Sequence, residues 1–242
     1  MVLNKKITRL ILYTFFICFI VFWGYLSYQK KGDWAISIYV GENPYELTPH
    51  PDIKDNPVLT RNSVKDIPKG FVADPFMIES NNKWYMFFEV FNSLTGHADI
   101  GLASSDDALI WNYEHIVIDE PYHLSYPYVF SWEKSFYMIP EGRRGGAIKL
   151  YKAMSFPYEW KFIKNLVEGN YADASIVYFD NTWWMFALKG YEKLTLFYAD
   201  SLKGEWIEHP KSPIIEDDKN IIRPGGRIVF HKNKMIRYVQ DG

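Results

Sequence analysis

The hydrophobic positions of this chain form short runs that recur in a fixed order from about residue 70 onward. Each unit has an opening run, an aromatic run, a run that ends in Ala-x-Ser and a closing tryptophan. Four openings are spaced by 52, 47 and 50 residues: Asp74, Tyr126, Asp173 and Arg223. Three closing tryptophans are spaced by 49 and 46 residues: Trp111, Trp160 and Trp206. Because two independent marks keep one period, the pattern indicates an internal repeat.

Each unit is typical of four short β-strands. The runs are rich in aromatic and β-branched residues, and polar turns such as Asn81-Asn82 and Asp180-Asn181 separate them. The runs are nearly continuous rather than alternating, which predicts that both faces of each sheet are buried. A four-stranded unit of about 50 residues, covered on both faces by its neighbours, predicts a blade of a β-propeller.

Two other fold classes fit the pattern less well. A β-sandwich does not need a fixed period, and an α/β fold needs helical stripes, which are missing between residues 34 and 242. We therefore predict an all-β propeller of four-stranded blades over residues 32–242. About three and a half units are visible, whereas propellers typically have about four to eight blades. The pattern thus predicts a propeller that is incomplete at its C-terminus, with residues 33–40 as a further strand that closes the ring.

The first thirty residues follow a different pattern. Residues 10–26 form an uncharged run of 17 residues with basic residues on both sides. A bilayer core requires about 17–25 apolar residues. We predict a membrane anchor over residues 1–31 that spans the bilayer at about 10–28. A cleaved signal peptide is the alternative, but no small-x-small site follows the run. The slight excess of basic residues before the run predicts a single-pass protein whose globular domain is extracytoplasmic.

Composition excludes several functions. The 27 basic and 29 acidic residues give a net charge of −2, which provides no basic footprint for nucleic acid. The one cysteine, Cys18, excludes an intramolecular disulfide and a cysteine-rich zinc site. Neither a P-loop nor a dinucleotide-binding motif occurs, and the six histidines lack the spacing of zinc-protease motifs. The sequence therefore predicts no cofactor and no metal.

Several segments resemble a known family. They are Val72–Phe76, His123–Phe130, Tyr137–Glu141, Phe156–Trp160 and Arg223–Arg227. In this order they are similar to the N-terminal domain of plant glucosamine inositolphosphorylceramide transferase and its bacterial relatives. That domain resembles the five-bladed propellers of arabinanases, levansucrases and invertases. In the plant enzyme the transferase chemistry resembles that of a separate C-terminal domain, so the resemblance implies a partner glycosyltransferase and a glycan or glycolipid ligand.

The resemblance also implies candidate site residues. In glycosidase propellers, acidic residues of the inner strands converge on a central funnel, where one activates water and another protonates the leaving oxygen. On this comparison Asp74 is the base, Glu141 the acid and Asp173 a third carboxylate. The implied substrate-binding residues are Tyr126, His123, Arg223 and Glu89. Each carboxylate also has a structural interpretation, as a strand entry, a hydrogen-bond acceptor or part of a surface ion pair.

Two functions remain open on these residues. The first is a membrane-anchored, carbohydrate-recognising or glycosyltransferase-associated propeller. The alternative is an inverting glycoside hydrolase or transglycosylase that acts on furanose-type glycans. Tyr126 stands where the second-blade acid of active glycosidases is expected, and this favours the first function. Fold-level analogy alone does not decide between them.

Overall fold

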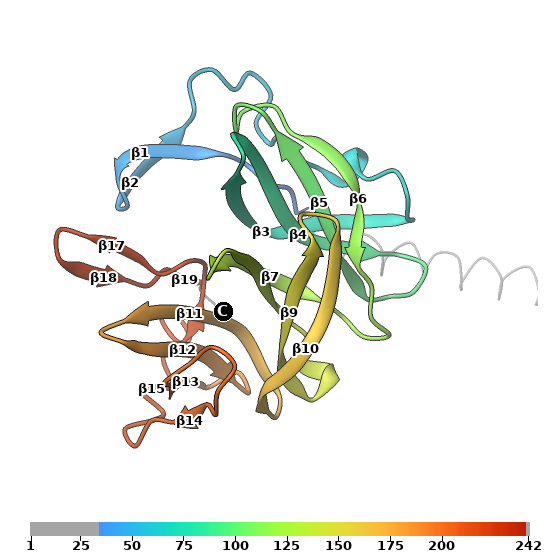
Figure 1. The fold of residues 1–242 in the computed structure, drawn as a ribbon. Coiled ribbons are helices and arrows are strands. Elements are labelled where there is room, and N and C mark those ends of the chain that lie inside the picture. The colour runs from blue at the N-terminus through green and yellow to red at the C-terminus, as the bar shows by residue number, and fades with distance from the viewer. Residues whose placement is uncertain (1–33, 241–242) are drawn as a thin grey trace, which may run out of the picture. The chain divides into compact units, whose positions relative to one another are not determined.

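Antiparallel four-stranded sheets follow one another along the chain (Figure 1). The structure is a computed structural model that describes residues 34–240. Within these residues it contains no α-helix, and no helix there is long and apolar enough to cross a membrane. The predicted membrane anchor, residues 1–31, lies outside the described residues.

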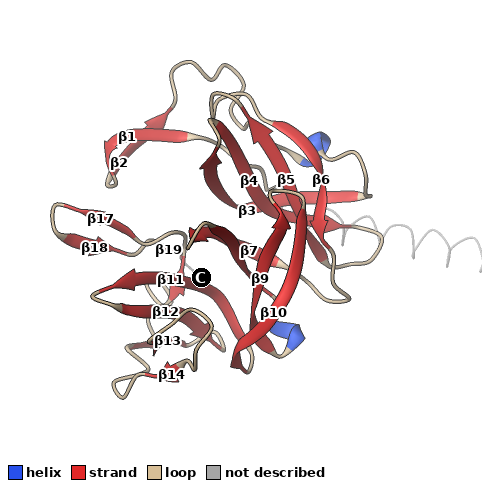
Figure 2. Cartoon of the chain, in the orientation of Figure 1, coloured by secondary structure: helices blue, strands red, loops and turns tan. Residues whose placement is uncertain are grey.

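Each of the three complete units predicted from the sequence forms one sheet in up-and-down order (Figure 2). The first sheet consists of β3 (Lys69–Ser80), β4 (Lys83–Asn92), β5 (Ala98–Ser105) and β6 (Asn112–Ile118). The second consists of β7 (Ser125–Trp132), β8 (Ser135–Glu141), β9 (Ala147–Ser155) and β10 (Glu159–Glu168). The third consists of β11 (Tyr171–Phe179), β12 (Thr182–Lys189), β13 (Lys193–Ala199) and β14 (Ile207–Glu208), and β15 (Ile215–Glu216) also pairs with β13.

The fourth unit is an irregular hairpin in the described residues. The short strand β16 (Arg223–Pro224) pairs with β19 (Val239–Gln240), and β17 (Val229–His231) pairs with β18 (Lys234–Ile236). The predicted first strand of this unit is therefore present but interrupted, and so is the second.

The turn between the first and second strands has the same geometry in all four units. Both turn residues have positive φ, as a type I′ turn requires, and two residues separate the flanking strands. The four turns are Asn81-Asn82, Glu133-Lys134, Asp180-Asn181 and Lys232-Asn233. This recurrence confirms the predicted repeat, including the start of a fourth unit.

The prediction for residues 33–40 is wrong in detail. The strand β1 (Tyr39–Asn43) begins later and pairs locally with β2 (Glu46–Pro49) rather than with the fourth unit. Ile36 and Ile38 are buried in the core of the first unit, and the Asn56 side chain bonds both the N–H and the C=O of Ile38. These contacts satisfy the backbone that a neighbouring strand would otherwise pair.

The first hairpin and the fourth unit nevertheless meet through side chains. The Tyr238 hydroxyl donates to the Pro44 carbonyl at 3.1 Å, and the rings of Tyr45 and His231 pack edge to face. The two ends of the described chain are thus joined by side-chain contacts and not by a β-ladder.

Two large hydrophobic clusters form the core. One extends across the three complete sheets and includes Phe87, Ile139 and Met185, each fully buried. Each closing tryptophan donates its indole N–H to a carbonyl of its own turn: Trp111 to Ala108, Trp160 to Pro157 and Trp206 to Leu202. The tryptophans therefore secure the loop before the fourth strand of each unit, which explains their period.

Candidate functional site

The predicted openings are β-bulges on the inner strands. Pairing between the first and second strands slips by one residue at the same point of each complete unit, where two residues face one. The first bulged residue has a left-handed backbone: φ is 49° at Asp74, 44° at Tyr126 and 52° at Asp173. First strands of consecutive units are in contact, β3 with β7, β7 with β11 and β11 with β16. The bulges therefore belong to one inner region (Figure 1).

The strand pairing corrects the predicted position of Arg223. In each unit one residue of the first strand pairs with the end of the second strand: Ala73 with Glu89, Ser125 with Glu141, Ala172 with Leu188 and Arg223 with Gln240. In the three complete units this residue directly precedes the bulge, whereas in the fourth unit Pro224, paired with Val239, comes between them. Arg223 is thus the counterpart of Ser125 and not of Asp74. The sequence spacing missed this because the bulge of the fourth unit is longer, with residues 225–228 facing residues 237–238.

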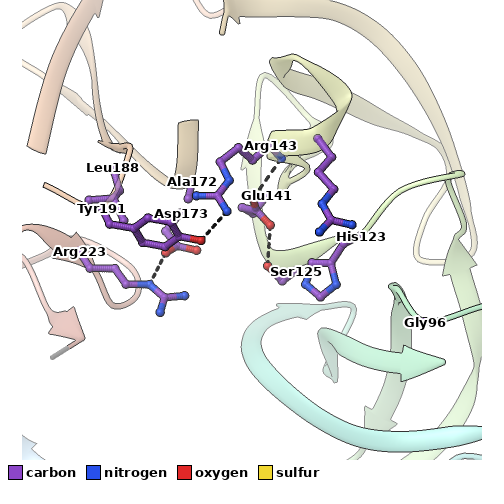
Figure 3. Close-up of a pocket in the computed structure, with 11 residues that line it drawn as sticks. Gly96, His123, Ser125, Glu141, Arg143, Ala172, Asp173, Leu188, Tyr191 and Arg223 are labelled. Atoms are coloured by element: carbon purple, nitrogen blue, oxygen red, sulfur yellow. Dashed lines mark hydrogen bonds and ion pairs between the residues drawn. The ribbon is translucent and has the colours of Figure 1, made fainter. Parts of the chain in front are cut away.

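A cavity of about 350 Å³ opens between the second and third units (Figure 3). It brings together four predicted site residues, Glu141, Asp173, His123 and Arg223. The other lining residues are Gly96, Ser125, Arg143, Arg144, Ala172, Leu188 and Tyr191. Carboxylates and guanidinium groups therefore face one space, which suits a polar ligand.

Glu141 is held by both of its oxygens. The Ser125 hydroxyl donates to Oε2 at 2.9 Å, and the backbone N–H of Arg143 donates to Oε1 at 3.0 Å. Burial raises the pKa of Glu141, and these two hydrogen bonds oppose the shift. The side chain is thereby fixed in direction by its own strand partner and by the following turn.

Asp173 forms an ion pair with Arg223 across two units. Oδ2 of Asp173 accepts from Nε of Arg223 at 2.5 Å, while Oδ1 has no hydrogen-bond partner among residues 34–240. The Asp173 side chain is 1% exposed and the Arg223 side chain 39%. Burial raises the pKa of Asp173 to about 6, although the attraction of Arg223 opposes the shift. One buried acceptor is therefore available to a ligand donor.

Glu89 and His123 form a second polar pair. His123 Nδ1 accepts the backbone N–H of Ala98 at 3.2 Å, so Nε2 carries the proton and faces Glu89 Oε1 at 3.3 Å. Burial, and next the charge of Asp74, raises the pKa of Glu89 well above its usual range. Burial, followed by Arg144, lowers the pKa of His123. His123 reaches the cavity, whereas Glu89 is buried behind it.

Asp74 lines a neighbouring cavity of about 400 Å³ and not the one that holds Glu141 and Asp173. Burial, and next the charge of Asp173, raises the pKa of Asp74 to about 6. The three predicted carboxylates thus interact electrostatically, but two line one cavity and the third lines the next.

Tyr126 is a structural tie in this region. Its side chain is 2% exposed, and its hydroxyl accepts the N–H of Gly226 at 2.6 Å and lies 2.8 Å from Ser175 Oγ. The bulge position of the second unit therefore links three units instead of presenting an acid.

Of the cavity residues that were not predicted as site residues, Arg143 and Tyr191 contact each other. Arg143 donates to the Tyr191 hydroxyl at 2.6 Å, and its guanidinium carbon lies 4.6 Å from the centre of the Tyr191 ring. Arg143 lies in a basic turn that follows β8, and Tyr191 is an exposed aromatic in a turn of the third unit. An exposed aromatic beside a turn glycine was the available signal.

Comparison with known proteins places the chain. The family model of "Glucosamine inositolphosphorylceramide transferase 1, N-terminal" matches residues 27–242. The chain belongs to this family. It is 37% identical over 234 residues to the Oryza sativa subsp. japonica transferase of that name, and 32% over 235 residues to the Arabidopsis thaliana one. The alignments cover 87% and 88% of this chain but 31% of each relative, so the chain spans less than a third of their length.

Solved structures show the same fold. An exo-1,5-α-L-arabinanase from a bovine ruminal metagenomic library matches with a TM-score of 0.60 at 14% identity, over 81% of this chain and 77% of that one. An exo-β-1,3-galactanase from Phanerochaete chrysosporium matches with a TM-score of 0.60 at 17% identity, over 72% and 43%. Both neighbours are β-propeller glycoside hydrolases, which confirms the predicted all-β propeller class.

Proposed function

We propose that residues 34–240 form a carbohydrate-binding domain that holds a glycan in the cavity between the second and third units. A carbohydrate-related role is supported by membership of the glucosamine inositolphosphorylceramide transferase N-terminal family and by a fold shared with glycoside hydrolases. One observation carries the choice of binding over hydrolysis: Tyr126 occupies the bulge where a second carboxylate is expected, and its hydroxyl is used in structural hydrogen bonds.

The cavity offers complementary partners for a sugar. Asp173 Oδ1 is a buried acceptor that a sugar hydroxyl can satisfy, and Glu141 is fixed beside it. Arg143 and Arg144 line the same cavity, and guanidinium groups bind phosphate or carboxylate in a bidentate way. The relatives' name specifies an inositolphosphorylceramide, so we propose that the ligand is an anionic glycan or the headgroup of an anionic glycolipid.

We also propose a membrane location. The apolar run at residues 10–26 would anchor the domain on the extracytoplasmic side, where it would present a glycolipid to a partner glycosyltransferase. This chain aligns with 31% of the length of its curated relative. This supports the proposal that glycan recognition and transfer belong to separate domains.

Hydrolysis is the second candidate function. The raised pKa values of Asp74 and Asp173, both about 6, suit carboxyl groups that exchange protons near neutral pH. An inverting hydrolase needs its acid and base about 6.5–9.5 Å apart with the substrate between them. Asp74 and Glu141 line different cavities, and the bulge of the second unit carries Tyr126 instead of an acid, so we favour binding.

The deciding experiment measures binding and turnover together. Full-length chain in detergent is tested for binding to the water-soluble headgroup released from glycosyl inositolphosphorylceramide, and for release of reducing sugar. Asp173→Asn should weaken binding by roughly 10- to 100-fold, because a charge-assisted hydrogen bond contributes about 1.5–3 kcal/mol. Arg143→Gln should also weaken it.

The matched control is Asp180→Asn, which changes an exposed turn residue outside the cavity and should bind like the wild type. Release of reducing sugar by the wild type that is lost in Asp74→Asn would overturn the binding proposal in favour of hydrolysis. Absence of headgroup binding by the wild type would also overturn it.

A further inference from the structure

A second cluster of polar side chains lies on the first unit, beside the glycan cavity. His97 precedes β5, Asp99 lies on β5 and Asp119 follows β6 directly. His97 Nε2 lies 3.5 Å from Asp99 Oδ1 and 3.9 Å from Asp119 Oδ1, and one ligand atom of each residue lies within 4.8 Å of the other two. Three ligands placed about 2.1 Å from one tetrahedral metal ion are about 3.4 Å apart. To hold such an ion, the distances between the three ligand atoms therefore need to shorten by about 1 Å or less on average.

The surroundings of Asp99 independently indicate that a cation binds at this point. Its side chain is 3% exposed, and Oδ1, the oxygen that faces His97, has no hydrogen-bond partner among the described residues. Buried carboxylate oxygens are normally satisfied because an unpaired one loses its hydration without replacement. A cation between Asp99 and His97 would satisfy this oxygen.

The other oxygen of Asp99 is held by its surroundings. The Asn92 side-chain amide donates to Oδ2 at 3.4 Å, and Asn92 Oδ1 accepts the N–H of Leu94 at 3.0 Å. The backbone N–H of Asn92 donates to the carbonyl of His97 at 2.9 Å. Asn92 thus fixes the loop that carries His97 and leaves Oδ1 directed at the cluster. Such support for a carboxylate is typical of metal sites.

The ligand set identifies the class of ion. One imidazole nitrogen and two carboxylate oxygens suit Zn²⁺, which takes three protein ligands and a water in open sites, whereas Ca²⁺ and Mg²⁺ prefer oxygen ligands alone. Asp119, 74% exposed, leaves the site accessible to solvent and free to adjust. We propose that His97, Asp99 and Asp119 bind one Zn²⁺ ion.

The position of the site suggests what the ion does. His97 and Asp99 flank Ala98, whose N–H donates to His123 of the glycan cavity, and Gly96 lines that cavity. A metal that joins this loop to the end of β6 would hold one wall of the cavity in place. The proposal concerns metal binding itself and stands independently of the proposed glycan function.

The experiment is a zinc titration of the full-length chain in detergent after treatment with EDTA. Competition with a chromophoric zinc chelator should show one Zn²⁺ per chain, and the bound protein should melt at a higher temperature. Asp119→Ala and His97→Ala should each reduce the zinc affinity at least tenfold. Asn92→Ala should reduce it by about 10- to 100-fold through loss of support for Asp99. Ca²⁺ at the same concentration should not compete.

Controls separate zinc binding at this site from binding elsewhere. His115→Ala removes a histidine that is not one of the three proposed ligands and stacks on Tyr158, and should keep the wild-type affinity. Asp119 is exposed, so its variant should fold, and a melting curve in EDTA checks this. Absence of bound zinc in the wild type, or equal zinc affinity in the wild type and Asp119→Ala, would overturn the proposal.

Discussion

At the scale of single residues, one position on each of three inner strands has a left-handed backbone conformation that most residues avoid. The left-handed conformation costs a non-glycine residue about 1–2 kcal/mol, and aspartate tolerates it better than tyrosine does. Asp74 and Asp173 therefore suit their bulges, whereas Tyr126 needs compensation from its surroundings. Its hydroxyl contacts Ser175 and Gly226, which belong to the third and fourth units.

Loss of that hydroxyl tests its structural role. Tyr126→Phe leaves the partly buried N–H of Gly226 without its acceptor, so we expect the free energy of unfolding to fall by about 1–3 kcal/mol. Denaturant unfolding of wild type and variant measures this. The control is Tyr178→Phe, at a ring that is 39% exposed, where we expect a change below about 0.5 kcal/mol. Equal stability of Tyr126→Phe and the wild type would contradict the assignment.

The pH dependence of stability tests the environment of Asp74. Its pKa rises from 3.8 to about 6 on folding, so the folded state binds the proton more tightly than the unfolded state. The contribution of the Asp74 carboxyl group to the free energy of unfolding is fully present below about pH 4 and is lost as the pH rises through about 6. The shift corresponds to at most about 3 kcal/mol.

The variant Asp74→Asn removes this contribution. Between pH 7 and pH 5 the wild type should therefore gain more in melting temperature than Asp74→Asn does. The exposed Asp180→Asn should follow the wild type across the same range. Parallel curves for the wild type and Asp74→Asn would show that the Asp74 pKa is not raised.

The site was predictable at this scale only in part. The repeat placed Asp74 and Asp173 on inner strands and Glu141 at the end of a second strand, because equal positions of a repeat take equal places in the fold. It did not give the partner of each carboxylate, since the longer bulge of the fourth unit shifts the register of Arg223, the partner of Asp173, and spacing does not reveal this shift. The Asp99 cluster was also missed, because Asp119 joins it from a different strand end.

At the scale of elements, the hairpins were the most predictable feature. A polar pair between two apolar runs is a local signal, and residues such as Asn and Asp tolerate the positive φ values that the turn needs. The strand at residues 33–40 was misplaced because its apolar residues do not reveal which unit they cover. Local patterns therefore predict where strands turn, and tertiary contacts decide what they pack against.

One hairpin uses residues that suit its turn poorly. Glu133 and Lys134 are exposed, with φ of 47° and 60°, where asparagine and glycine are preferred. Replacing both by Asn-Gly should raise the free energy of unfolding by about 1–2 kcal/mol. Chemical denaturation measures the gain. The comparison is Asn82→Gly in the first unit. Asparagine already fits there, so the gain in the free energy of unfolding should be only a small fraction of the gain from the Asn-Gly replacement. A neutral or destabilising Asn-Gly replacement would argue against the type I′ geometry.

At the scale of the whole molecule, the repeat predicted the class of fold but not how its ends meet. A period of about 50 residues implies consecutive four-stranded sheets, whichever side chains pack between them. The contacts of Tyr238 with Pro44 and of Tyr45 with His231 join segments nearly two hundred residues apart. No local pattern encodes such pairs.

The membrane anchor is also a prediction for the whole molecule. The run at residues 10–26 is long enough to span a bilayer, so full-length chain should remain with membranes after washing with high salt and with alkaline carbonate, and should be released by detergent. N-terminal sequencing should still find the first residues. Charged residues at the centre of a span cost about 2.5–3.5 kcal/mol each, so Ile17→Arg with Ile20→Arg should move the protein to the carbonate supernatant. The matched pair Ile17→Leu with Ile20→Leu should stay in the pellet, and a mature protein that begins near Gly32 would instead identify the run as a cleaved signal peptide.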